Sequence, residues 1–277
     1  MNQLLKETRE FKILFKKSLN LLSGKYTSKI KGEGIEFVDL KEYVPGDDIR
    51  KIDWNVTARE NKPFIKEFLG EKDANHYVLI DISASMKNKF NIAKILASSL
   101  LLSSNKSRDN YSIGFFNSEN IKIFPLTKNK NQLMRYIYEI SKINSSKKGN
   151  MAKLLIRLLK TIQKKSIISI ITDELELDDQ ILSLISAIKQ KHKLNYFHLY
   201  SSKEKNLEIG LNSFEDIETG YNGIYDLDEN EIIEYKQEFE NQLNLIKINL
   251  LKIGIKPFII DSDNNLYIQI KKHSEEI

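Results

Sequence analysis

From residue 76 onward, short apolar runs alternate with longer segments of helical periodicity, and this alternation most constrains the fold. The runs predicted as strands are 77–80, 111–116, 121–124, 167–171, 194–200, 255–260 and 266–270. The predicted helices between them are 88–104, 130–142, 151–164, 178–190 and 228–251. Strands separated by helices form right-handed crossovers, so the sequence predicts an α/β fold with a doubly wound, mostly parallel sheet. The turn at 117–120 makes one edge strand antiparallel.

Residues 1–75 depart from this pattern and form a predicted extension of the main domain, which spans 76–277. Helical spacing of apolar residues over 1–23 predicts a helix, and 63–68 is predicted as a strand. The rest is a turn-rich strap, predicted to pack on the main domain through ion pairs or, alternatively, to contact a partner. The residues predicted to pair are Asp47, Asp48, Arg50, Asp53 and Arg59. A polar, irregular excursion is predicted at 201–227.

Two of the predicted strands end in a carboxylate, Asp81 and Asp173. In a doubly wound sheet, ligands bind beyond the carboxyl ends of the strands. Two carboxylates about 5 Å apart repel by roughly 3 kcal/mol at an effective dielectric constant of about 20, and a divalent cation compensates this repulsion directly. Ser83 and Ser85 add hydroxyl oxygens to the same loop, a donor set that suits hard Mg²⁺ or Mn²⁺. A capped helix start is the alternative interpretation of this loop.

The string Asp81-Ile-Ser-Ala-Ser-Met86 resembles the metal-ion-dependent adhesion site of von Willebrand factor A domains, and Ile171-Thr-Asp173 resembles the later aspartate loop of that site. Upstream motifs resemble a widespread bacterial family of uncharacterised proteins, domain of unknown function fifty-eight, usually encoded beside MoxR-type AAA+ ATPases. These motifs are Lys31–Phe37, Leu40–Arg50, Ile52–Trp54 and Thr57–Arg59, and the resemblance covers about residues 20–260.

This resemblance implies a von Willebrand A-like, Rossmann-like domain that binds protein through a metal and is not an enzyme. The implied partner is a MoxR-type AAA+ ATPase, with the chain as an adaptor in chaperone-like assembly. The family carries Gly-Gly-Thr before the helix at 151, where the threonine is a metal ligand, whereas this chain carries Gly149-Asn150. We therefore expect the metal ligands to be Asp81, Ser83, Ser85, Asn150 and Asp173, with an amide oxygen replacing the threonine hydroxyl.

Several classes of function are disfavoured by what the sequence lacks. There is no cysteine, no Walker A motif and no Gly-x-Ser-x-Gly elbow, so thiolate chemistry, intrinsic ATPase activity and serine hydrolysis are not expected. The four histidines show no metal-binding spacing and are predicted to lie at the surface or at strand ends. Two alternatives stay open: a metal-dependent phosphate-ester hydrolase, and a nucleic-acid-binding protein suggested by the sequence pI of about 9.0.

The charge and hydropathy patterns also give expectations for partners and location. Lysines are spread along the chain and mixed with acids, which is typical of a solvated surface, so no nucleic-acid partner is expected. No apolar run approaches the roughly 18 residues that a membrane span requires. The first residues carry both acidic and basic side chains in place of the apolar core of a signal peptide, and a cytoplasmic location is expected.

Overall fold

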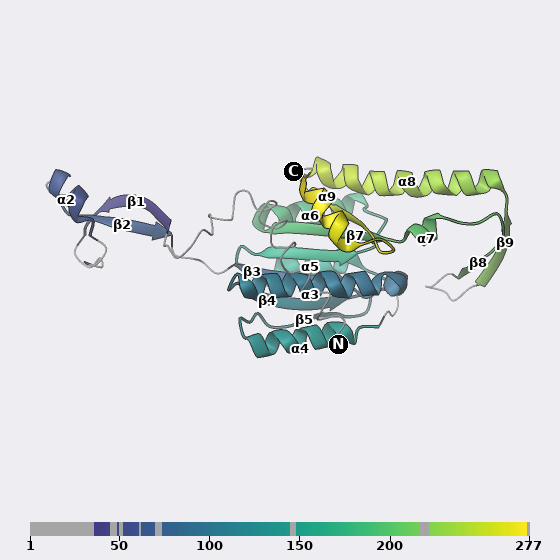
Figure 1. Ribbon diagram of the computed structural model, residues 1–277, viewed down its shortest axis with the longest axis horizontal. Coiled ribbons are helices and arrows are strands. Elements are labelled where there is room, and N and C mark those ends of the chain that lie inside the picture. Colours follow the sequence, from purple (N-terminus) through teal and green to yellow (C-terminus); the bar gives the residue numbers. More distant parts are fainter. Residues whose placement is uncertain are drawn as a thin grey trace. The chain divides into compact units, whose positions relative to one another are not determined.

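A computed structural model describes residues 36–44, 49, 52–60, 62–69, 74–144, 148–215 and 222–275 (Figure 1). The chain divides into two compact units, residues 23–73 and the remainder, and each is described by itself. The helix predicted over 1–23 lies outside the described residues. Among the residues that are described, none of the helices combines the length and apolar character needed to cross a bilayer.

The smaller unit contains an antiparallel strand pair, β1 (Glu36–Glu42) and β2 (Phe64–Leu69), and the short helix α2 (Trp54–Glu60). Strand β2 matches the strand predicted at 63–68. The Asp53 carboxylate accepts hydrogen bonds from the backbone N–H groups of Asn55 and Val56 and so caps α2. Three of the residues predicted to form ion pairs lie outside the described residues, so the strap's ion pairs and its packing on the main domain stay predictions.

The main unit is built on a six-stranded sheet with the order β10-β7-β6-β3-β4-β5. All neighbouring pairs are parallel except β4 and β5, which the turn after Phe116 makes antiparallel. The doubly wound sheet with one antiparallel edge strand is therefore confirmed. The strands are β3 (Asn75–Asp81), β4 (Asn110–Phe116), β5 (Ile121–Ile123), β6 (Ile167–Thr172), β7 (Lys193–Tyr200) and β10 (Phe258–Asp261).

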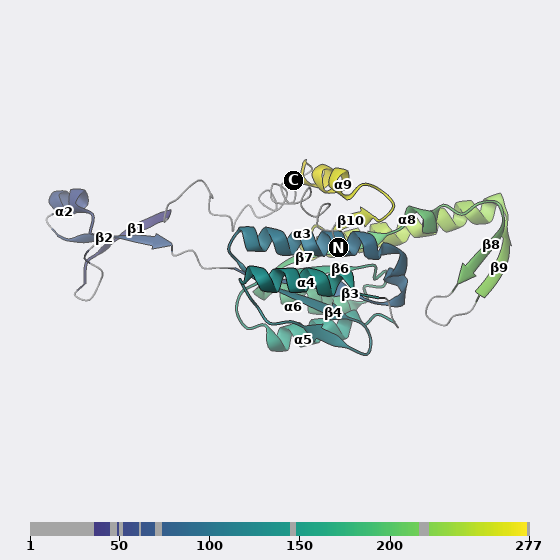
Figure 2. The same ribbon diagram turned by 60° about the horizontal axis from the view of Figure 1, so that its bottom comes forward.

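Helices cover both faces of this sheet, as Figures 1 and 2 show from two directions. One face packs against α3 (Phe90–Lys106), α4 (Lys130–Ser141) and α9 (Leu266–Glu275). The other packs against α5 (Met151–Thr161), α6 (Asp179–Lys191) and the C-terminal half of α8 (Glu229–Lys252). The sequence of β3 is continuously apolar because both of its faces are buried: Val78 and Ile80 enter the first core, and Leu79 enters the second.

Two predictions about secondary structure were wrong. Residues 266–270 form the start of α9 and not a strand. The pattern Leu-Tyr-Ile-Gln-Ile alternates, but Leu266 and Ile270 are also four residues apart, and both are buried in the first core. The Asn265 side chain accepts a hydrogen bond from the Tyr267 backbone N–H, 2.9 Å away, and favours the helical start.

The excursion at 201–227 is not irregular throughout. It contains the short helix α7 (Ser202–Lys205) and a hairpin of β8 (Gly210–Glu215) and β9 (Asn222–Leu227). Its apolar residues are too widely spaced among polar ones to show an obvious strand period.

The N-terminus of α8 is closed by the predicted capping pair. Asp228 accepts a hydrogen bond from the Glu231 backbone N–H, and Glu231 accepts one from the Asp228 backbone N–H, each at 2.9 Å. We expect Asp228→Ala to lower the free energy of unfolding by about 1 kcal/mol, because one helix N–H loses its acceptor. Urea denaturation measures this, and Asp226→Ala, on the adjoining strand, is the control that should change little.

Candidate functional site

The parallel pairing of β3 and β6 brings the two predicted strand-end carboxylates to one edge of the sheet. Ile80 pairs with Ile171, so Asp81 lies beside Thr172, and the Thr172 hydroxyl donates to Asp81 Oδ2 at 2.7 Å. Asp173 follows directly. The geometry thus depends only on strand register, which the buried apolar faces fix.

The loop after β3 brings both predicted serines to these carboxylates. The Ser83 backbone N–H donates to Asp81 Oδ1 at 2.9 Å, and the Ser83 and Ser85 hydroxyls lie 3.1 Å apart. The Ser85 hydroxyl donates to Asp173 Oδ1 at 3.0 Å. Four of the five predicted ligands, Asp81, Ser83, Ser85 and Asp173, therefore lie in one hydrogen-bonded cluster of hard oxygen atoms. A short 3₁₀ turn, Ala84–Lys89, follows them and leads into α3.

The fifth predicted ligand, Asn150, has a capping role in the structure. Its side-chain oxygen accepts a hydrogen bond from the Lys153 backbone N–H at 2.8 Å, at the start of α5. The preceding residue, Gly149, reaches the cluster: a Cβ at this position would lie 3.6 Å from Asp81 Oδ2. An amide oxygen has two lone pairs, so capping leaves one of them for a metal. The ligand role of Asn150 stays a prediction.

Sequence reasoning missed Lys89, which lies inside the cluster. Its ammonium nitrogen is 3.1 Å from Asp173 Oδ2, 2.9 Å from Glu204 Oε2 and 3.2 Å from the Ser85 carbonyl oxygen. Only 6% of the side chain is exposed. Burial alone would lower the pKa of Lys89, but the Asp173 and Glu204 carboxylates raise it overall, so the side chain stays charged. Lys89 thereby links the cluster to α7.

A third acid, Glu174, also lies at the site and was missed, although it directly follows Asp173. Burial, and then the nearby Asp81 carboxylate, raises the pKa of Glu174 to about 7. Burial and the Asp173 carboxylate likewise raise the pKa of Asp81 to about 6, although hydrogen bonds from Thr172 and Ser83 oppose this. The site therefore holds more negative charge than Lys89 compensates, and a cation or protons must bind there to relieve it.

These residues fit a hard divalent cation through hydroxyl and carboxylate oxygens together. Within the described part of the chain, no group of three or more His, Cys, Asp or Glu side chains is arranged to hold a metal. Binding of a divalent cation therefore requires the hydroxyls of Ser83 and Ser85 as well as the carboxylates of Asp81 and Asp173. This set contains few anionic ligands. Such a set suits Mg²⁺ or Mn²⁺, which retain water and exchange it for an incoming oxygen ligand.

The cluster opens into a pocket of about 910 Å³, lined by the site residues and by parts of β7, α7 and α8. Its wall includes His198, which is fully buried and has no hydrogen-bond partner on either ring nitrogen within the described part of the chain. The prediction that the histidines lie at the surface or at strand ends was wrong for His198, which is buried in the interior of β7, whereas His76 and His192, although buried, lie next to the starts of β3 and β7. Strands covered by helices on both faces bury polar side chains along with apolar ones, which composition alone does not reveal.

Comparisons with known proteins show weak likeness to curated relatives. Uncharacterised proteins of Mycobacterium bovis and Mycobacterium tuberculosis are 33% identical to this chain over 79 residues. The match covers 28% of this chain and 25% of each relative, so the chain matches about a quarter of the length of these relatives.

Solved structures with a similar fold share little sequence. An aerotolerance-related membrane protein from Bacteroides fragilis is 16% identical with a TM-score of 0.43, covering 74% of this chain and 100% of that one. A von Willebrand factor type A protein from Catenulispora acidiphila is 12% identical with a TM-score of 0.40, covering 74% and 41%. At these scores the likeness carries no functional argument.

The sequence profile of one family matches most of the chain, from residue 39 to residue 243. This range includes part of β1, all of β2, both carboxylate-bearing strand ends and the first half of α8. It confirms the family that the upstream motifs resemble. The chain therefore belongs to the family described as "Protein of unknown function DUF58".

Proposed function

We propose that this chain is a metal-dependent protein-binding module and that its metal lies at Asp81, Ser83, Ser85 and Asp173. The observation that carries the proposal is the convergence of these four residues in one pocket, with carboxylates that Lys89 compensates only in part. A pocket that is open to solvent and rich in oxygen donors can hold a cation and still admit a group from a second protein.

The side chains of the site have separable roles in this proposal. Asp81 is held by the Ser83 N–H and the Thr172 hydroxyl, so its carboxylate keeps a fixed orientation. Ser85 and Lys89 fix Asp173 in the same way. A bound Mg²⁺ would supply an electrophilic centre able to accept one more anionic oxygen. The chemistry favours an Asp or Glu of the partner as that ligand.

For the partner we propose a MoxR-type AAA+ ATPase, with this chain as an adaptor in chaperone-like assembly. The support is the resemblance to a family usually encoded beside such ATPases. The chain has no Walker A motif of its own, which fits a division of labour in which ATP hydrolysis belongs to the partner.

The test uses Asp81→Asn, which removes one charge and keeps the shape of the side chain. Calorimetry should show that Mg²⁺ binds the wild type and binds the variant at least tenfold more weakly, a loss of about 1.4 kcal/mol. A MoxR-type ATPase encoded beside this gene should be captured by the wild type in Mg²⁺, less in EDTA, and not by the variant. Asp179→Asn, an exposed acid on α6, is the matched control and should behave as the wild type. Equal Mg²⁺ binding by the wild type and Asp81→Asn would reject the metal site.

One observation favours a second candidate, a metal-dependent phosphate-ester hydrolase. Glu174, with its pKa raised to about 7, has the proton affinity that a general acid or base needs near neutral pH. This candidate predicts steady hydrolysis of p-nitrophenyl phosphate in Mg²⁺ by purified protein, lost in both Asp81→Asn and Glu174→Gln. A rate no higher than that of buffer alone removes the hydrolase and leaves the binding module.

A further inference from the structure

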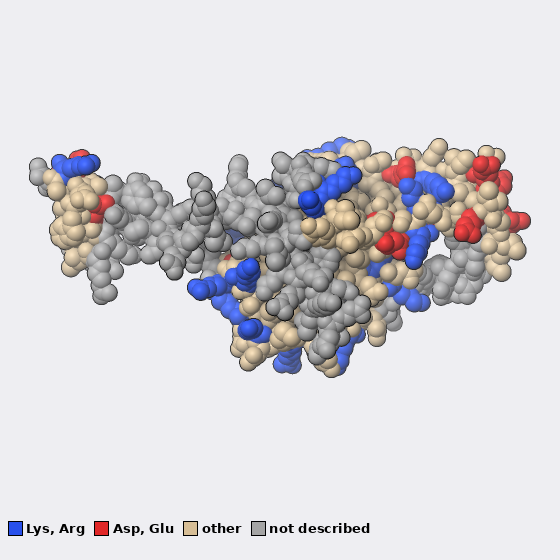
Figure 3. Space-filling view, in the orientation of Figure 1, with Lys and Arg blue, Asp and Glu red and all other residues tan. Residues whose placement is uncertain are grey.

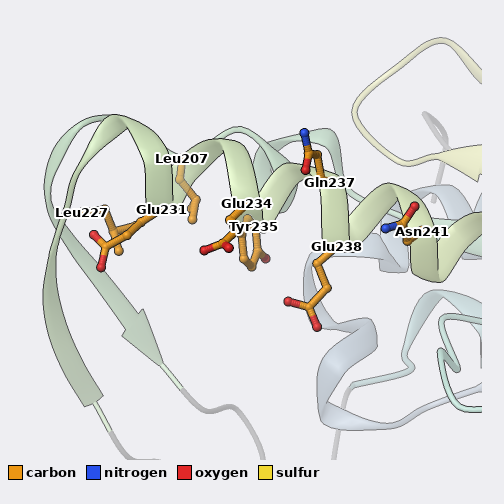
Figure 4. A pocket seen from close by; sticks show the side chains of 8 residues that line it. All are labelled: Leu207, Leu227, Glu231, Glu234, Tyr235, Gln237, Glu238 and Asn241. Carbon is orange, nitrogen blue, oxygen red and sulfur yellow. The ribbon is translucent and has the colours of Figure 1, made fainter.

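Beside the metal-site pocket, the helix α8 carries a second groove of about 520 Å³, here called the α8 groove. Figure 4 shows the side chains that line it. Its acidic residues are Glu231, Glu234 and Glu238, and its apolar residues are Leu207, Leu227 and Tyr235. Leu207, Tyr235 and Glu238 also line the metal-site pocket, so the two hollows adjoin each other.

The α8 groove is acidic in a chain whose formal net charge is +5. Spacings of three and four residues place its three glutamates on one face of α8, and no Lys or Arg lines it among the described residues. On the face shown in Figure 3, many of the visible Asp and Glu side chains gather around α8 and the β8–β9 hairpin. Among the described residues, no ion-pair partner is found for Glu234 or Glu238. Their charge is therefore available to a ligand.

A second, independent observation points to a ligand in the adjoining pocket. His198 lines its wall, is fully buried, and finds no hydrogen-bond partner for Nδ1 or Nε2 among the described residues. Burial, and then the nearby Lys89 ammonium, lowers the pKa of His198 to about 3, so the ring is neutral and presents one donor and one acceptor. Buried polar groups normally find partners, and a ligand that reaches into the pocket supplies them.

The hairpin next to the groove adds exposed apolar surface. Ile209, Leu211 and Ile224 are 71%, 79% and 72% exposed. Leu211 and Ile224 share a face of the hairpin, because Leu211 pairs with Asp226 and Ser213 pairs with Ile224. Exposed aliphatic side chains on one face of a hairpin offer apolar surface to a partner. A small inorganic cation has no apolar group to cover them, and a polyamine has only short methylene segments between its charges, whereas a peptide offers whole aliphatic side chains.

We propose that the α8 groove binds a basic peptide segment of a partner protein. Lys or Arg side chains of the segment pair with Glu231, Glu234 and Glu238, and its aliphatic side chains cover the exposed face of the hairpin. Its end enters the metal-site pocket and hydrogen-bonds His198. This goes beyond the proposed function, because the contact requires no metal.

The test measures fluorescence anisotropy of a labelled short peptide that alternates Arg and Leu, with the full chain in EDTA. The wild type should bind it, and binding should weaken as salt is raised. The corresponding Glu-Leu peptide should not bind. The double variant Glu234→Lys with Glu238→Lys should bind the basic peptide at least tenfold more weakly. The matched control is Glu60→Lys with Asp179→Lys, which makes the same charge change at exposed acids elsewhere and should bind as the wild type.

Two further arms distinguish the proposal from its alternatives. Because the assay is run in EDTA, failure of the metal site leaves its result intact. If the charge-reversed protein fails to fold, Glu234→Gln and Glu238→Gln replace it in the assay. Each of these variants removes one charge without introducing repulsion and should weaken binding several-fold. Equal binding by the groove variant and its control would overturn the proposal. So would displacement of the peptide by spermine at equal charge concentration, which would assign the groove to polyamines.

Discussion

Lys89→Met is expected to lower the free energy of unfolding by about 3 kcal/mol in EDTA and to tighten Mg²⁺ binding at least tenfold. Methionine fills a similar volume, so the change chiefly removes the charge. The ammonium of Lys89 is bound by Asp173 and Glu204, and without it both carboxylates lose their cation beside Asp81. Glu204 is 34% exposed, which places the cost at the lower end of the range for breaking a buried ion pair.

The same charge argument sets the sign of the effect on metal binding. Lys89 and a divalent cation both compensate Asp173, so each lowers the affinity of the site for the other. Removing Lys89 therefore leaves the metal as the remaining compensating charge, and Mg²⁺ should restore much of the stability lost in EDTA.

Thermal unfolding with and without Mg²⁺, together with calorimetry, measures both effects. Lys87→Met, an exposed lysine in the same 3₁₀ turn, is the control and should leave both unchanged. A Lys89→Met protein as stable as the wild type in EDTA would show that the ion pairs are worth little. A folded Lys89→Met variant with unaltered Mg²⁺ affinity would show that the charge of Lys89 does not affect metal binding.

The sequence predicted the part of the site that depends on strand ends. Asp81 and Asp173 follow buried apolar strands, and parallel pairing alone brings them together, so no side-chain detail was needed. The placement of Ser83 and Ser85 beside the carboxylates was predicted because the two serines alternate with other residues in one short loop. Lys89 could not be predicted in this way, because its place depends on the 3₁₀ turn that directs it back toward Asp173. Glu174 had a signal, its position next to Asp173, but one acid after another is a common surface pattern.

The elements of the fold were likewise predicted where the sequence pattern is unambiguous and missed where it is not. Segments with an unambiguous pattern, such as the continuous apolar run of β3 and the helical periods of α5 and α8, were predicted close to their observed bounds because burial of one or both faces fixes the pattern. The short segment 266–270 fits both a strand and a helix, and tertiary packing with the Asn265 cap decides between them. The β8–β9 hairpin was missed for a different reason: Leu211 and Ile224 are exposed, so no core imposes a period on it.

Buried histidines set the expected response of the fold to acid, and His76 provides the clearest case. Its Nδ1 lies 2.6 Å from the Ser104 hydroxyl, and its Nε2 lies 2.8 Å from the Ser169 hydroxyl, which also accepts a hydrogen bond from the Asn195 amide. Burial, and then the Lys193 charge, lowers the pKa of His76 from 6.5 to about 4. The folded protein thus holds this ring neutral through a pH range in which the unfolded chain protonates it.

The sign of the pH dependence follows directly. A histidine whose pKa is lower in the folded state stabilises the fold fully above pH 6.5, and that stabilisation is lost as the pH falls toward the folded-state pKa of about 4. At pH 4 the loss is about 3 kcal/mol, at 1.36 kcal/mol for each unit of pKa shift. Asp81 and Glu174, with raised pKa values, act in the opposite direction over this range, so the wild-type profile alone does not isolate His76.

His76→Phe isolates the contribution of His76, because both proteins share every other titrating group. At pH 7.5 the variant should be about 2 kcal/mol less stable, since it loses two hydrogen bonds. By pH 4 that deficit should shrink by about 3 kcal/mol, so the order of the two stabilities reverses. Urea denaturation from pH 7.5 to pH 4 measures the difference, and above pH 7.5 it should stay constant because the ring is neutral in both states. A difference that is independent of pH throughout would mean that His76 takes up its proton in the folded state, with Ser104 and Ser169 turning to accept it.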